Sequence, residues 1–129
     1  MSDFLTLKVD IIKNFGTPCA VVDLNVLEKN ISRVQKICDN AGLSNRPHIK
    51  THKSGEVARM QIDAGASGVT CQKLGEAEVM AAAGITDILI ATNLLGAAAS
   101  GALSALQSRF SLKVCADNTY SIKAYSDAA

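Results

Sequence analysis

Nine residues at positions 46–54, RPHIKTHKS, concentrate cationic or titratable side chains: Arg46, His48, Lys50, His52 and Lys53. Like charges disfavour the ammonium form of a lysine, and the neutral amine can then attack a carbonyl carbon. Lys50 lies in the middle of the group and so has the setting of a Schiff-base lysine. Three other interpretations stay open: a solvated basic loop, a phosphate-binding patch, or a metal site made by His48 and His52.

The composition restricts the class of protein to which this chemistry could belong. The chain has 129 residues, of which 48% are hydrophobic and 19% charged, and its net charge is +1. These values are typical of a soluble protein of at most one domain, without the basic excess of a nucleic-acid-binding protein. Polar residues interrupt the most apolar region, 85–106, and charges interrupt the start. We therefore expect a cytoplasmic protein with no membrane span and no nucleic-acid partner.

The four cysteines show no spacing that indicates a zinc site or a disulfide framework. They lie far apart, at positions 19, 38, 71 and 115. Their spacing predicts reduced thiols buried in the core.

The elements that would position the basic stretch alternate between strand and helix. The pattern predicts strands at 20–22, around Ile49, and at 68–71, 88–91 and 112–116, with helices at 25–41, 54–64, 74–83 and in the alanine-rich segment after 91. Asn25 and Glu28 have the form of a capping box, and Gly42 can end the helix that follows. Three helices end at the same dipeptide, Ala-Gly. Such alternation indicates parallel strands covered by helices.

Two parallel architectures compete, an open doubly wound sheet and a (β/α)8 barrel. The open sheet favours a glycine-rich turn after its first strand, where this chain has lysine and histidine. A complete barrel takes about 250 residues. The sequence therefore predicts an α/β fold, a partial (β/α)8 TIM-type barrel comprising about its first half. Residues 1–24 would form an N-terminal segment with a short strand and residues 25–129 the incomplete barrel, whose open edge should make the chain unstable or prone to associate.

Polar residues follow each predicted strand: Lys50, Thr51 and His52; Gln72 and Lys73; Thr92 and Asn93; Asp117 and Asn118. The carboxyl ends of parallel barrel strands converge on one rim, where such folds hold their active sites. The plainer interpretation is that loops are polar because they lie at the surface.

Side-chain alternation assigns the basic residues to one face. If Ile49 faces the helices, then Arg46, His48 and Lys50 face the barrel interior. Burying these groups would cost several kcal/mol unless an anionic or hydrogen-bonding partner meets them. A phosphate-bearing cofactor would be a suitable partner.

Four stretches occur in an order that resembles the D-threonine aldolase and D-serine dehydratase family: TPCAVVDLNVLEKNI, RPHIKTHKS, GVTCQKLGEAEVMAAAGITDILIATNLLG and LKVCADN. The members are pyridoxal-phosphate (PLP) enzymes with a barrel domain like that of alanine racemase. The resemblance covers nearly the whole chain from Thr17 onward. It implies that Lys50 is the catalytic, PLP-holding lysine, that Lys53 is a nearby cation, and that Gln72 contacts the cofactor. His52 and Asn93 are weaker candidates of the same kind.

The resemblance also implies a reaction. In the aldolases a D-β-hydroxy amino acid loses its Cα–Cβ bond and yields glycine and an aldehyde, whereas in the dehydratases the hydroxyl is eliminated and a keto acid and ammonia result. The sequence favours the aldolase. D-serine dehydration and a non-catalytic PLP carrier remain alternatives, and a third is a truncated chain that folds poorly and does nothing.

The rest of the family's machinery is expected outside these residues. The resemblance implies a divalent metal in the full-length parent, bound with the cofactor phosphate by residues of the C-terminal half, so no residue here is assigned to metal. A small D-amino acid would be the substrate and a homodimer the assembly. The 129 residues alone should be inactive.

Overall fold

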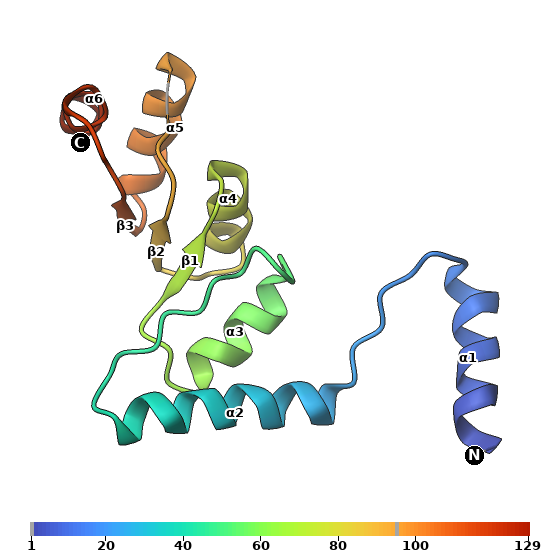
Figure 1. Ribbon diagram of the computed structural model, residues 1–129. Helices are drawn as coiled ribbons and strands as arrows, with labels where there is room; N and C mark the ends of the chain where they lie inside the picture. The colour runs from blue at the N-terminus through green and yellow to red at the C-terminus, as the bar shows by residue number, and fades with distance from the viewer. Residues whose placement is uncertain (1, 95) are drawn as a thin grey trace.

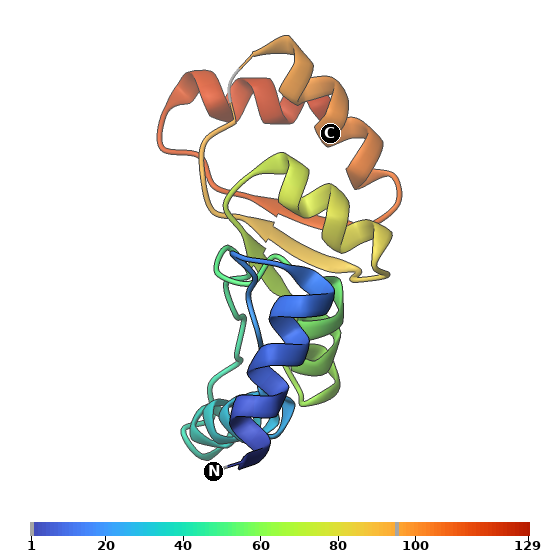
Figure 2. The ribbon, with the colours of Figure 1, turned by 90° about the vertical axis from the view of Figure 1, so that its right-hand side faces the viewer.

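The computed structural model describes residues 2–94 and 96–129 and contains a parallel sheet covered by helices (Figure 1). The elements follow the order α1 (Ser2–Phe15), α2 (Leu24–Asn40), α3 (Gly55–Asp63), β1 (Val69–Cys71), α4 (Leu74–Ala82), β2 (Asp87–Ile90), α5 (Ala97–Gln107), β3 (Ser111–Val114) and α6 (Thr119–Ala128). Figure 2 shows the three strands side by side and the two termini at opposite ends of the molecule. Within the described residues, no helix combines the length and the hydropathy that a membrane crossing needs.

The sheet has the order β1-β2-β3, and both pairs are parallel. Its register places Thr70 opposite Leu89 and Leu89 opposite Lys113. Every second side chain along the strands packs against the helices. The fully buried residues of this core include Ile49, Val69, Cys71, Met80, Ile88 and Ile90. The predicted α/β class with parallel strands is thus confirmed, and Ile49 faces the helices as alternation required. We call the opposite side of the sheet its open face.

The first predicted barrel strand is reduced to a single bridge. His48 pairs in parallel with Thr70, and no regular strand forms around Ile49. Pro47 explains part of this, because it has no N–H to extend the ladder. Its carbonyl still accepts a hydrogen bond from the Thr70 N–H at 2.8 Å.

The N-terminal segment differs from its prediction. Residues 2–15 form α1, and residues 20–22, expected as a strand, are not in one. Val21 and Val22 are both more than half exposed, and no strand of the described residues pairs with them. Figure 1 shows α1 standing apart from the other helices, joined to α2 by an extended segment. The proposed domain boundary at residue 24 stays a prediction.

The ends of α2 confirm one expectation and correct another. Gly42 has a φ of 66°, the left-handed conformation expected after the helix. Asp23, however, is the N-cap, and its Oδ1 accepts from the Val26 N–H at 3.1 Å. The predicted capping box of Asn25 and Glu28 is therefore wrong, because both residues lie inside the helix.

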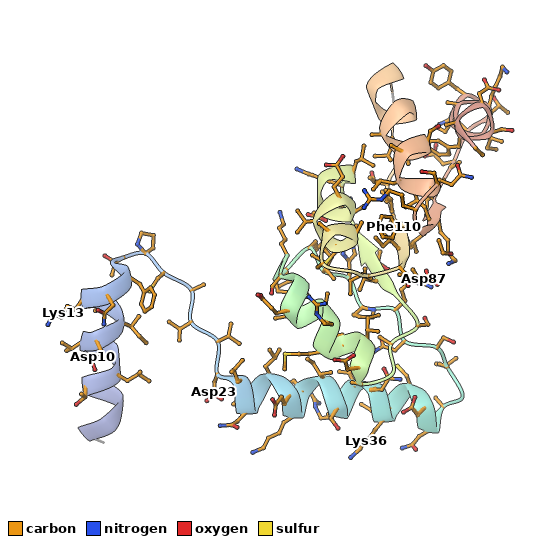
Figure 3. The ribbon with its side chains drawn as sticks, turned by 180° about the vertical axis from the view of Figure 1, so that it is seen from behind. Asp10, Lys13, Asp23, Lys36, Asp87 and Phe110 are labelled. Atoms are coloured by element: carbon orange, nitrogen blue, oxygen red, sulfur yellow. The ribbon has the colours of Figure 1, made fainter. Side chains whose placement is uncertain are left out.

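A network of charges lies on the open face around Asp87. Its Oδ1 accepts from Arg46 Nη1 and from Lys113 Nζ, each at 2.7 Å. In Figure 3, Asp87 lies on the side of the sheet away from α3 and α4. The expectation that Arg46 requires a partner from outside the chain is wrong, because Asp87, 41 residues later, supplies the carboxylate.

Asp87→Asn should reduce stability and change its pH dependence. The Arg46 guanidinium, followed by the Lys113 ammonium, holds the pKa of Asp87 below its ordinary value of 3.8 against the opposing effect of burial. A lowered folded-state pKa means that the stabilisation is complete above 3.8 and is lost as pH falls through the folded value. We expect the variant to lose about 1 kcal/mol at pH 7. It should also lose part of the acid sensitivity below pH 3.8, as measured by urea unfolding. The control is Asp63→Asn, at an exposed carboxylate without a described partner, and it should change neither the stability at pH 7 nor its dependence on pH. Equal pH profiles of stability for Asp87→Asn and wild type would contradict the prediction.

Gly68→Ala should disturb the same corner of the sheet sterically. A Cβ at Gly68 would lie 2.6 Å from the backbone oxygen of Asp87 and would collide with the Arg46 guanidinium. We expect a loss of about 1–3 kcal/mol in the free energy of unfolding. Gly75→Ala is the matched control, because its Cβ would meet open space in α4 and should stabilise by about 0.5–1 kcal/mol. Equal stability of the two variants in urea titrations would refute this account.

Candidate functional site

Lys50 lies at the carboxyl end of the segment that pairs with β1. The Ile49 N–H donates to the Thr70 carbonyl at 2.9 Å, and the chain then turns away from the sheet. The Lys50 side chain is exposed, and no ion pair within the described residues involves it. A primary amine without a paired carboxylate therefore stands at this edge.

The other predicted site residues follow the neighbouring strands at the same edge. Gln72 comes directly after β1 and Asn93 shortly after β2, and both are half-buried. The Asn93 Oδ1 is buried and has no hydrogen-bond donor among the described residues. Within that same set, no hydrogen bond joins the Lys50 and Gln72 side chains. The structure thus places Lys50, Gln72 and Asn93 at one edge of the sheet, while their roles stay predictions.

Asn118, between β3 and α6, has a structural role. Its Oδ1 accepts from the Ser121 N–H at 2.8 Å and caps α6. Its Nδ2 donates to the neighbouring Asp117 at 2.6 Å. The polarity at this strand end is therefore explained by helix capping.

The turn after Lys50 is held by several hydrogen bonds. The Ile49 carbonyl accepts from the N–H of His52 at 3.2 Å and from that of Lys53 at 2.8 Å. Lys53 has a φ of 50°, a left-handed conformation that is uncommon for a side-chain-bearing residue. Such strain persists only where the surroundings hold it in place.

Glu76, in the first turn of α4, is the acidic residue of this edge. Its Oε2 accepts from the Gln72 N–H at 2.7 Å, and its Oε1 lies 3.3 Å from Lys53 Nζ. Its side chain is 9% exposed. Burial alone would raise the pKa of Glu76, but the hydrogen bonds from the Gln72 N–H and from Lys53 lower it below its ordinary value. Glu76 is thus a carboxylate at neutral pH.

These pairs correct the idea that Lys50 is crowded by unpaired cations. Arg46 is bound to Asp87, and Lys53 is bound to Glu76. The chain supplies a carboxylate for each neighbouring cation. Arg46 and Lys53 therefore do not surround Lys50 with unpaired charge.

The two histidines each use Nδ1 to accept a backbone N–H. The Nδ1 of His48 accepts from the Lys50 N–H at 3.3 Å, and the Nδ1 of His52 accepts from the Ser54 N–H at 3.1 Å. Burial lowers the pKa of His52 from its ordinary 6.5, and its Nε2 is buried without a hydrogen-bond partner among the described residues. Within the described part of the chain, no three His, Cys, Asp or Glu side chains gather as metal ligands would.

The cysteines are free thiols in different environments. Cys71 is fully buried, and its burial, together with the Glu76 carboxylate, raises the pKa of the thiol to about 12. Cys71 therefore stays protonated and has no nucleophilic role. Cys19 and Cys115 are exposed, so the prediction that all four thiols are buried is wrong.

Sequence reasoning assigned no role to Glu76 or Asp87. Glu76 had a local signal, because an acid at the third position of a helix commonly accepts backbone N–H groups at the helix start. Asp87 had none, because its partners Arg46 and Lys113 are distant in sequence.

Comparison with known proteins places this geometry in a family. A family model described as "Alanine racemase, N-terminal domain" matches residues 22–129. D-threo-3-hydroxyaspartate dehydratase of Delftia sp. (strain HT23) is 48% identical over 85 residues, which are 66% of this chain and 22% of the relative. D-threonine aldolase of Arthrobacter sp. is 37% identical over 119 residues, 92% of this chain and 31% of the relative.

The solved structures agree with the sequence relatives. The crystal structure of D-threonine aldolase from Filomicrobium marinum superposes with a TM-score of 0.85 at 38% identity, over 87% of this chain and 30% of that one. The chain spans less than a third of the length of these relatives. Because the family model matches most of the chain, from the start of α2 through α6, the chain belongs to the alanine racemase N-terminal domain family.

Proposed function

We propose that the chain is the N-terminal part of a PLP-dependent lyase acting on D-β-hydroxy amino acids, with Lys50 as the residue that holds the cofactor. The observation that carries the proposal is the exposed Lys50 amine at the carboxyl edge of a parallel sheet. The relatives support it, because their names describe aldolases and dehydratases of D-3-hydroxy amino acids. The sheet would then be part of a (β/α)8 barrel, and the protein would act as a homodimer.

The residues present fit the aldehyde end of PLP. The Lys50 amine has the chemistry required to attach to an aldehyde, and the buried Asn93 Oδ1 at the same edge lacks a donor. PLP, when bound, withdraws electrons from the carbanion left at the substrate Cα. The chain's own residues would shape that site: Gln72 directly follows β1 at this edge, and His52, whose pKa is lowered by burial, lies in the turn after Lys50.

Of the two reactions, we propose the retro-aldol cleavage of D-threonine to glycine and an aldehyde. The D-threonine aldolase of Arthrobacter sp. matches 92% of the chain, the greater coverage of the two relatives above. Dehydration is the second candidate, because the Delftia dehydratase has the higher identity, 48% over 85 residues. A divalent metal held by residues outside this chain is part of either proposal.

Lys50→Ala tests the attachment site in full-length protein that carries this sequence. Borohydride reduction after incubation with PLP should fix the cofactor on the wild-type peptide containing Lys50, as located by mass spectrometry. The variant should lose that label, together with at least about 1,000-fold of any lyase activity. Lys36→Arg, on the surface of α2, is the control and should keep both. Wild-type protein without label at Lys50 would refute the proposal.

Product analysis separates the two reactions. With D-threonine and a divalent metal we expect aldehyde and glycine, and removal of the metal by a chelator should lower the rate at least tenfold because the metal helps bind the hydroxyl. D-serine and D-threo-3-hydroxyaspartate should yield little keto acid and ammonia by comparison. Ammonia and keto acid as the main products would overturn the aldolase assignment in favour of dehydration.

A further inference from the structure

The basic stretch contains two lysines, and the structure gives them different environments. Lys50 is exposed without an ion-pair partner among the described residues, whereas Lys53 lies 3.3 Å from the Glu76 carboxylate. They are three positions apart and belong to one tight turn, whose N–H groups converge on the Ile49 carbonyl. A cofactor aldehyde arriving at this edge would therefore meet two primary amines within one turn.

Only a neutral amine attaches to an aldehyde. The nitrogen adds to the carbonyl carbon, a C=N bond replaces the C=O bond, and the carbonyl oxygen leaves as water with the two protons of the amine. The attacking nitrogen must also be free to approach the aldehyde carbon, and a lysine held in an ion pair must first leave its carboxylate. The ion pair with Glu76 thus disfavours attachment at Lys53 and leaves Lys50 unaffected.

Glu76 is well placed for this because it is itself fixed. Its second oxygen accepts the Gln72 N–H at 2.7 Å, which attaches the carboxylate to the end of β1. The left-handed φ of Lys53 orients that residue within the turn. Glu76 therefore joins the end of β1, the start of α4 and the turn that carries both lysines.

We propose that Glu76 is a positioning residue that directs PLP to Lys50 by holding the Lys53 nitrogen in an ion pair. This inference rests on the proposed function, because it presupposes that PLP attaches at this edge. It assigns to the first of the two glutamates in the CQKLGEAE stretch a role in choosing between the two amines. The Lys53 side chain is 59% exposed, so its ion pair should be worth what an exposed pair is worth. The resulting preference for attachment at Lys50 over Lys53 should be about two- to fivefold.

The test measures where PLP attaches, in full-length protein carrying this sequence. PLP is fixed by borohydride, and the ratio of label at Lys53 to label at Lys50 is read by peptide mass spectrometry. Glu76→Gln retains an oxygen for the Gln72 N–H but removes the charge, and should raise the ratio about two- to fivefold. Glu78→Gln, an exposed residue of the same helix, is the matched control and should leave the ratio at the wild-type value.

A second measurement needs no substitution and remains informative if Glu76→Gln fails to fold. Raising the salt concentration of the wild-type protein to about 1 M screens exposed ion pairs, so the share of label at Lys53 should rise. A ratio that changes neither with salt nor in folded Glu76→Gln would overturn the inference while label at Lys50 still supports the proposed function. Wild-type protein without label at Lys50 would refute the proposed function itself, so the two failures are distinct.

Discussion

The parallel register of β1, β2 and β3 is the constraint on which the rest of the structure depends. By placing Thr70, Leu89 and Lys113 in one row, it sends the alternate residues to the helix side, where Ile88 and Ile90 form the centre of the core. Every polar side chain of the opposite parity must then find a partner on the open face or at an edge of the sheet. The positions of the charges are thus a consequence of the apolar packing.

Two carboxylates meet this requirement at two places. Asp87, at the start of β2, binds Arg46 and Lys113, while Glu76, after the end of β1, binds Lys53 and the Gln72 N–H. The first pair of contacts spans elements far apart in sequence and so contributes to the sheet. The second is local and fixes a turn. Pairing the neighbouring cations in this way leaves Lys50 as the lysine of the basic stretch without an ion pair among the described residues.

The sequence predicted most of the regular elements, because their signals are local. Periodic apolar residues indicated α2 through α5 and β1 through β3, and Gly42, Gly65 and Gly84 all have the positive φ expected after a helix. The errors fall where a partner decides the outcome. Residues 20–22 have strand-forming side chains but no neighbouring strand, and the anionic partner of Arg46 lies 41 residues away. No local pattern carries such information, whereas the contact of Glu76 within four residues could have been found.

The relatives also limit what this part of the fold can decide. An aldolase at 37% identity and a dehydratase at 48% identity both match the segment that contains the basic stretch and the edge of the sheet. Enzymes named for different bond cleavages are thus both similar to this part of the chain. On the proposed function, these residues carry what both reactions need, an amine held at a defined place and a neighbouring amine kept paired. The choice between the two reactions would then depend on which bond of the substrate's Cα is held perpendicular to the cofactor ring, and the contacts around Lys50, Lys53 and Glu76 fix the turn and not the substrate.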